Sequence, residues 1–306
     1  MAGFDPVTSQ GVAITNLFWL LLALSFLLLL FVVGWLTYAL VRFRARPGDP
    51  DPPQAAGSRR LEIAWTAAPL ALLAIIFFLT VGTVRAVERP DASPVRLVVI
   101  GHQWWWEVRY PDLGVTTANE PHVPVGTPLQ IEIESADVLH SFWIPQFGFM
   151  RDAVPNKTNV IRVRVERPGT YDGACTQFCG LQHAWMRSRV IAQPPAEFEA
   201  WVQQQRQPAA PPGSSLALRG QQILLANTCV SCHAIQGTTA AGQVAPNLTH
   251  LGSRTTIGAG VAANTPEQLR SWIQNPQAIK PGVLMPGYSF SSDELTALVT
   301  YLEGLR

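Results

Sequence analysis

Two long apolar runs near the N-terminal end restrict the possible folds of this chain more than any other feature. They cover residues 17–41 and 63–84, and neither contains Asp, Glu, Lys or Arg. A helix of about 20 apolar residues crosses the roughly 30 Å hydrocarbon core of a bilayer and satisfies its own backbone hydrogen bonds there. The sequence therefore predicts two transmembrane helices, the second kinked but not broken by Pro69.

The charges around these runs predict their orientation. The connecting loop carries Arg42, Arg44, Arg46, Arg59 and Arg60, whereas the tail before the first run has no Lys or Arg. Positive loops stay on the cytoplasmic side, so we expect everything from about residue 90 onward on the outer face. The tail also lacks the basic region of a signal peptide, which indicates a retained first helix. A net charge of +1 offers no general basic surface for nucleic acid.

Beyond the second run the residue pattern changes twice. From about 95 to 192, short β-branched runs bounded by Gly, Pro and Asn predict an antiparallel sandwich. After a Pro-rich stretch, helical periodicity returns, and Ser291 with Glu294 predicts a capping box at the last helix. We therefore expect a membrane-anchored multidomain chain. Its predicted parts are a tail and helix hairpin (1–90), a β domain (91–202), a linker (203–214) and an all-α domain (215–306).

Residues 175–186 predict a soft-metal site. This segment reads Cys-Thr-Gln-Phe-Cys-Gly-Leu-Gln-His-Ala-Trp-Met and contains Cys175, Cys179, His183 and Met186. Thiolate and thioether sulfur select copper or iron–sulfur over calcium or magnesium, and imidazole suits copper and zinc, so the mixture points to copper first. A local disulfide between the two cysteines is the alternative.

A second cofactor motif follows in the all-α region. Cys229-Val-Ser-Cys232-His233 has the C-x-x-C-H spacing at which two thiols attach a haem and the histidine binds its iron. A chance match or a redox dithiol is the alternative. Met285, in a Pro- and Gly-containing loop, is the predicted second iron ligand, with His250 as its rival. The two motifs use all four cysteines of the chain, and two redox centres indicate electron transfer.

Four motifs in order carry a resemblance to a known family. They are Glu62-Ile-Ala-Trp-Thr66, Gly101-His-Gln-Trp-Trp-Trp106, Asp137-Val-Leu-His-Ser141 and the segment 175–186. The sequence resembles bacterial cytochrome c oxidase subunit II with a cytochrome c fused to its C-terminus. The resemblance implies a cupredoxin-like β-barrel with a binuclear copper (CuA) centre, then a class I cytochrome c domain with covalent haem c.

The resemblance also implies a role for each site residue. Cys175 and Cys179 bridge the two coppers, His140 and His183 each bind one, and Met186 is a weak ligand. Gln177 contributes its backbone carbonyl. Family members commonly have Glu at the position of Gln177, where it helps to hold magnesium or manganese, so we expect no such ion here.

Two further residues take roles from the family. Trp104 matches the exposed residue at which electrons enter from cytochrome c, a donor that here is the tethered haem, whereas Trp105 and Trp106 are expected to be structural. Glu62 matches a glutamate at the mouth of a proton pathway into subunit I.

The predicted function is electron entry into a proton-pumping oxidase. Electrons pass from an external donor to haem c, then to CuA, then to subunit I, where oxygen is reduced to water. The expected partners are subunit I, further oxidase subunits, membrane lipid and a respiratory donor, which is a soluble or membrane-bound cytochrome or complex. The expected location is the bacterial plasma membrane, with both redox domains on the periplasmic face. Two alternatives are the equivalent subunit of a CuA-containing nitric oxide reductase and a membrane-anchored copper-delivery protein.

Overall fold

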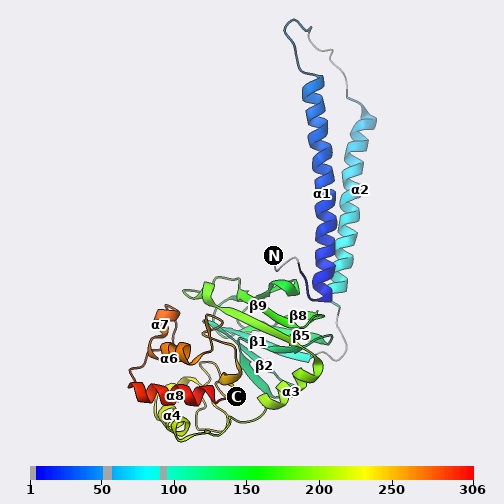
Figure 1. The fold of residues 1–306 in the computed structure, drawn as a ribbon. Helices are drawn as coiled ribbons and strands as arrows, with labels where there is room; N and C mark the ends of the chain where they lie inside the picture. Colours follow the sequence, from blue (N-terminus) through cyan, green and yellow to red (C-terminus); the bar gives the residue numbers. More distant parts are fainter. Residues whose placement is uncertain (1–4, 51–56, 90–94) are drawn as a thin grey trace. The chain divides into compact units, whose positions relative to one another are not determined.

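The computed structural model describes residues 5–50, 57–89 and 95–306. The chain divides into two compact units, one within residues 12–89 and the other made of the N-terminal segment up to Gly11 and the chain from residue 95 onward. Helices α1 (Ser9–Arg42) and α2 (Arg59–Val87) are both long and apolar enough to cross a membrane (Figure 1). Each includes one predicted apolar run with polar residues at its ends, and α2 continues through Pro69.

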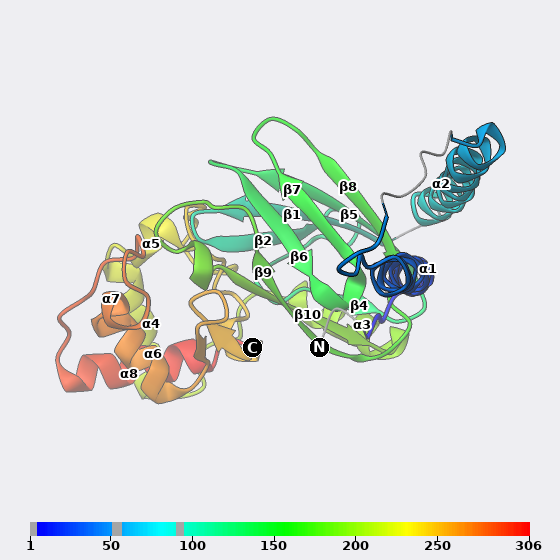
Figure 2. The same ribbon diagram turned by 90° about the horizontal axis from the view of Figure 1, so that it is seen from above.

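The β domain, which we define as residues 95–205, contains two five-stranded sheets (Figure 2). The first sheet has the order β3 (Val115–Ala118), β2 (Trp105–Tyr110), β1 (Val95–His102), β5 (Pro128–Ser135) and β8 (Asn159–Arg164). The second has the order β4 (His122–Pro124), β10 (Arg187–Gln193), β9 (Gly169–Cys175), β6 (His140–Ile144) and β7 (Phe149–Ala153). These two sheets give the expected cupredoxin-like architecture.

The expectation of a wholly antiparallel sandwich is wrong at two strand pairs. β1 pairs with β5 in parallel, and β4 pairs with β10 in parallel, whereas the other pairs within these sheets are antiparallel. A parallel pair needs a long crossover connection, and the chain between β1 and β5 is long enough because it forms β2, β3 and β4 on the way. Alternating sequences identify strands but do not encode the direction of their partners.

Side-chain alternation builds the core of the β domain. In β5, Leu129, Ile131 and Ile133 are buried while the residues between them are partly exposed, as expected for successive side chains on opposite faces of a sheet. Trp104 and Trp106 both belong to this core, whereas Trp105 is half-buried and stacks on His102 with ring centroids 4.4 Å apart. Helix α3 (Pro195–Gln205) follows β10 and continues into the segment predicted as a linker.

The helical domain, residues 215–306, has its own hydrophobic core. Its helices are α4 (Ser215–Ala226), α5 (Cys229–Cys232), α6 (Pro266–Gln274), α7 (Pro276–Ile279) and α8 (Ser292–Glu303), with a short hairpin of β11 (Thr256–Ile257) and β12 (Ala262–Ala263). The predicted capping box of Ser291 and Glu294 is confirmed at the start of α8. A Cβ at Gly220 would lie 2.0 Å from the Ala297 carbonyl oxygen, so only glycine permits this close approach of α4 and α8.

Candidate metal centres

One edge of the second sheet brings the predicted copper ligands together. Cys175 is the last residue of β9, and Met186 directly precedes β10, so the segment 175–186, here called the ligand loop, connects two neighbouring strands. His140 begins β6, which pairs with β9 so that Phe142 lies opposite Cys175. The sheet register therefore places a residue 35 positions earlier in the chain beside the loop.

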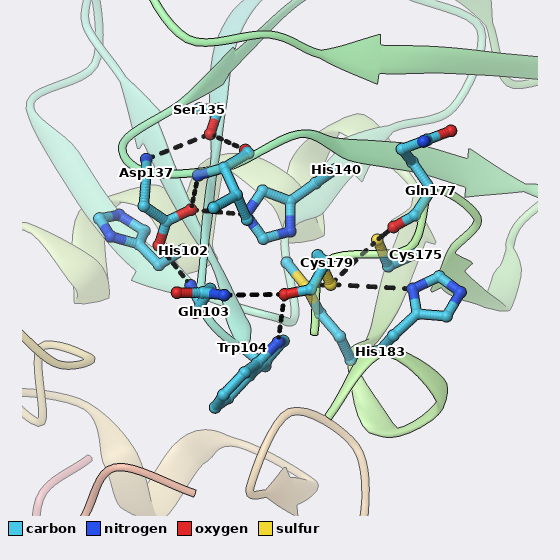
Figure 3. Close-up of polar contacts among 12 residues, drawn as sticks. His102, Gln103, Trp104, Ser135, Asp137, His140, Cys175, Gln177, Cys179 and His183 are labelled. Carbon is cyan, nitrogen blue, oxygen red and sulfur yellow. Dashed lines mark hydrogen bonds and ion pairs between the residues drawn. The ribbon is translucent and has the colours of Figure 1, made fainter. Parts of the chain in front are cut away.

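The donor atoms of these residues converge on a small volume (Figure 3). Donor atoms of His140, Cys175 and Cys179 all lie within 4.8 Å of one another. From Cys179 Sγ, the distances are 3.8 Å to Cys175 Sγ, 3.7 Å to His183 Nδ1 and 3.9 Å to Met186 Sδ. Cys175 Sγ lies 3.2 Å from the Gln177 carbonyl oxygen. The cysteines are free thiols, because a disulfide requires sulfurs about 2.05 Å apart, so the disulfide alternative does not describe this site.

Hydrogen bonding leaves one nitrogen of His140 available to a metal. Its Nε2 lies 2.7 Å from Asp137 Oδ1 and donates to that carboxylate, whereas Nδ1 is buried and has no hydrogen-bond partner among the described residues. Gly101 makes room for the ring, since a Cβ there would lie 2.7 Å from His140 Cδ2. A carboxylate that orients a ligating histidine is a common feature of metal sites. Sequence reasoning did not give Asp137 a role, although the D-x-x-H spacing was visible.

The electrostatics of the site favour a bound cation. Burial, together with the neighbouring charge of Cys175, raises the pKa of the Cys179 thiol to about 12. Burial also lowers the pKa of His140, which keeps its imidazole neutral and able to coordinate. Two neighbouring thiolates are unfavourable without a metal, whereas a coordinated metal deprotonates thiols outright. Donor set, orphaned nitrogen and pKa shifts all fit copper held by sulfur and nitrogen.

The C-x-x-C-H motif forms the short helix α5 and the residue after it. Cys229 and Cys232 are free and half-buried. His233 Nδ1 donates to the Pro246 carbonyl oxygen at 2.7 Å, and burial lowers the pKa of its imidazole. The neutral ring therefore keeps Nε2 for an iron atom, which fits covalent haem attachment.

The two rivals for the second iron ligand differ in their surroundings. His250 is buried, and its Nε2 lies 3.2 Å from the Gln205 carbonyl oxygen and 3.1 Å from that of Gln207. This nitrogen is therefore engaged by the end of α3 and the chain beyond it. Met285 is half-buried in the connection between α7 and α8. The role of Met285 as the second iron ligand stays a prediction. Its rival, His250, bonds backbone carbonyls instead.

Trp104 contacts the ligand loop directly. Its indole Nε1 donates to the Cys179 carbonyl oxygen at 2.9 Å, and the Gln103 side-chain amide donates to the same oxygen at 2.8 Å (Figure 3). Only 8% of Trp104 is exposed. Glu62 lies exposed in the first turn of α2. The roles of Trp104 in electron entry and of Glu62 in proton entry stay predictions.

Comparisons with known proteins agree with this two-centre architecture. Residues 113–193 match the family of the periplasmic domain of cytochrome c oxidase subunit II, and residues 217–306 match the cytochrome c family. The class is thus a subunit II periplasmic domain joined to a cytochrome c domain.

Similarity to individual proteins extends over most of the chain. Cytochrome c oxidase subunit 2 of Alkalihalophilus pseudofirmus is 38% identical over 87% of this chain and 80% of its own length. The protein of the same name from Bacillus subtilis is 33% identical over 88% of this chain and 82% of its own length. The chain belongs to the cytochrome c oxidase subunit II family, whose members are components of haem–copper oxidases.

Proposed function

We propose that this chain is the electron-entry subunit of a proton-pumping cytochrome c oxidase. The observation that carries the proposal is the convergence of six candidate copper ligands in a chain that also contains a C-x-x-C-H motif with its histidine oriented for iron. Copper and haem c held at these sites supply one-electron carriers between a respiratory donor and subunit I, where oxygen is reduced to water.

Each copper ligand has a distinct task. The Cys175 and Cys179 sulfurs, 3.8 Å apart, would hold the copper, with His140 Nδ1 and His183 Nδ1 as the nitrogen donors. The sulfur of Met186 and the carbonyl of Gln177 complete the set. A rigid, buried set of this kind keeps its geometry when the charge of the centre changes, and Asp137 holds the His140 ring in place.

The haem ligands come from one stretch of the helical domain. Cys229 and Cys232 would be the attachment points, and His233 Nε2 would bind iron while the Pro246 carbonyl holds its Nδ1. Met285 is the proposed second iron ligand, and its sulfur would raise the haem potential relative to a second imidazole.

The two apolar helices are proposed to anchor the chain in the bacterial plasma membrane. The arginine-rich connection supports a location of both redox domains on the outer face. Trp104 is the proposed entry point to the copper centre from the haem of the same chain, because its indole bonds the backbone of Cys179. Glu62 is proposed to lie at the proton entry shared with subunit I. Further oxidase subunits and lipid complete its surroundings.

Purification of the complex from its native membrane tests this function. We expect two coppers and one haem c per copy of this chain, a mixed-valence copper spectrum, and oxygen consumption with reduced donor. Consumption of nitric oxide without oxygen reduction would instead identify a nitric oxide reductase. A chain that copurifies with exchangeable copper, no haem and no partner subunit would contradict electron entry altogether.

A further inference from the structure

Lys280 is an unusual residue in its surroundings. The chain has two lysines, Lys157 and Lys280, and Lys280 is only 1% exposed. Lysine is rarely buried this completely without partners for its ammonium group. Lys280 follows α7 in the helical domain, in a connection that also contains Met285. Neither its position next to Pro281 nor any motif assigns it a function.

The Lys280 side chain joins the helical domain to the β domain. Its Nζ donates to the Gly258 carbonyl oxygen of its own domain at 3.0 Å and to the Trp104 carbonyl oxygen of the β domain at 3.0 Å. Trp104 in turn donates from its indole to the Cys179 carbonyl oxygen at 2.9 Å. A single residue, Trp104, therefore separates the Lys280 ammonium from the ligand loop.

The backbone after Lys280 follows the same surface. A Cβ built on Gly282 would lie 3.3 Å from Leu181 Cβ and 3.4 Å from the Gln182 side-chain nitrogen, so this segment lies against the ligand loop. Lys280 consequently sits at the point where the connection that carries Met285 meets the loop that carries the copper ligands.

We propose that Lys280 is a positioning residue that fastens the helical domain to the β domain at Trp104 and thereby fixes the haem-to-copper geometry. The effect on haem-to-copper geometry rests on the proposed electron route. The contact between the two domains does not depend on that route. The Lys280 nitrogen carries at least two N–H groups whether it is charged or neutral, so it can donate to both carbonyl oxygens at once. The rate of electron transfer depends steeply on the separation of the two centres. A contact that maintains this separation therefore affects the rate of haem-to-copper transfer.

The first experiment measures the burial of Lys280 in the unaltered protein. The purified complex is treated with an amine-acylating reagent, and the two ε-amines are followed by peptide mass spectrometry. We expect rapid modification of the exposed Lys157 and protection of Lys280 until the chain is unfolded. Modification of Lys280 in the native complex as fast as in the unfolded chain would overturn the proposal, independently of any result with substituted chains.

The second experiment compares Lys280→Met with the matched control Lys157→Met. Trypsin cleavage after Arg206 reports separation of the two domains, because His250 of the helical domain bonds the backbone carbonyls of Gln205 and Gln207 on either side of it. Because trypsin does not cut before proline, loss of Lys280 leaves the cleavage map unchanged. We expect cleavage to accelerate about ten- to a hundredfold in Lys280→Met, as for loss of two buried hydrogen bonds. We also expect flash-induced haem-to-copper transfer to slow.

The haem spectrum of Lys280→Met separates positioning from folding of the helical domain. We expect an unchanged haem spectrum together with faster linker cleavage, because the variant leaves the haem ligands intact. Wild-type rates of both cleavage and transfer in Lys280→Met would refute the positioning role. If instead no electron passes from haem to copper in the unaltered chain, the proposed electron route fails while linker and amine protection still test the fastening.

Discussion

Replacement of Glu120 by Gln tests the second point at which the helical domain is fastened to the β domain. The Glu120 carboxylate is 3% exposed and lies in the turn between β3 and β4. It accepts the backbone N–H of Thr255 at 2.8 Å and that of Thr256 at 2.7 Å, and it also accepts both threonine hydroxyls. Glu120→Gln preserves the shape of the side chain and removes one of its two acceptor oxygens.

The size of the effect follows from these contacts. The Gln carbonyl oxygen can keep one backbone N–H, but the amide NH₂ group then faces the other N–H as a second donor. One bond to a charged acceptor is lost and a backbone donor is left unpaired, which costs about 2–3 kcal/mol. Each 1.4 kcal/mol is a factor of ten, so the docking equilibrium constant should fall about 30- to 150-fold. The two threonine hydroxyls can rotate to accept hydrogen bonds from the Gln amide. The loss of their bonds to the carboxylate therefore adds little to this cost.

Trypsin cleavage at Arg206 in the assembled complex measures this change, with Glu166→Gln at an exposed position of the same domain as the control. We expect faster linker cleavage in Glu120→Gln, an unchanged copper spectrum and an unchanged control. A cleavage rate equal to that of the unaltered chain would show that the Glu120 contacts contribute nothing to docking, and the reasoning from hydrogen-bond geometry would be refuted.

Four further predictions concern the two centres and their domains. Cys179→Ser should abolish the mixed-valence copper spectrum and spare the haem, and a retained seven-line copper resonance would contradict the ligand assignment. Met285→Ala should leave haem attached but lower its potential and open the iron to added ligands. A persisting sulfur–iron absorption band near the red end of the spectrum would contradict the assignment of Met285. Burial lowers the pKa of Lys280 from 10.5 to about 7; the undocked state therefore binds more protons between these values, and linker cleavage should slow as pH rises from 7 to 9, not accelerate. Ser291→Ala should lower the unfolding free energy of the helical domain by about 1 kcal/mol through loss of its cap, measured by denaturant titration.

The residues of the ligand loop could be predicted because their chemistry is local. Cys175, Cys179, His183 and Met186 lie within one short connection between neighbouring strands, so their spacing limits how far apart they can be. His140 was assigned through the family resemblance, and the pairing of β6 with β9 supplies the physical reason for its place beside them. The start of α8 could be predicted equally well, because its capping residues Ser291 and Glu294 are local in the sequence.

Contacts between domains left no such trace in the sequence. Glu120 lies 135 residues before Thr255, and Lys280 lies 176 residues after Trp104. Both look like ordinary surface charges when read singly, because periodicity reports which face of an element is buried and not which residue covers it. The parallel pairing of β1 with β5 escaped for a similar reason, since strand direction depends on the path of the intervening chain. Distant partners of this kind are set by tertiary packing alone.

Glu120 and Lys280 connect the two domains in opposite ways. Glu120 belongs to the β domain and accepts from the backbone and hydroxyls of the helical domain, whereas Lys280 belongs to the helical domain and donates to a backbone carbonyl of the β domain. Neither contact pairs the two charges with each other. Both side chains bond neutral groups at fixed positions, and Glu120 also attracts the Arg254 guanidinium of the helical domain. Such bonds act only at short range and require one orientation, whereas long-range attraction between charged surfaces is screened over about 10 Å at 0.1 M salt. A domain already held by a linker needs no long-range capture, because the linker keeps it at high effective concentration. The linker does not fix the orientation of the helical domain on the β domain. The buried contacts of Glu120 and Lys280, which lie at different parts of the interface, can fix this orientation.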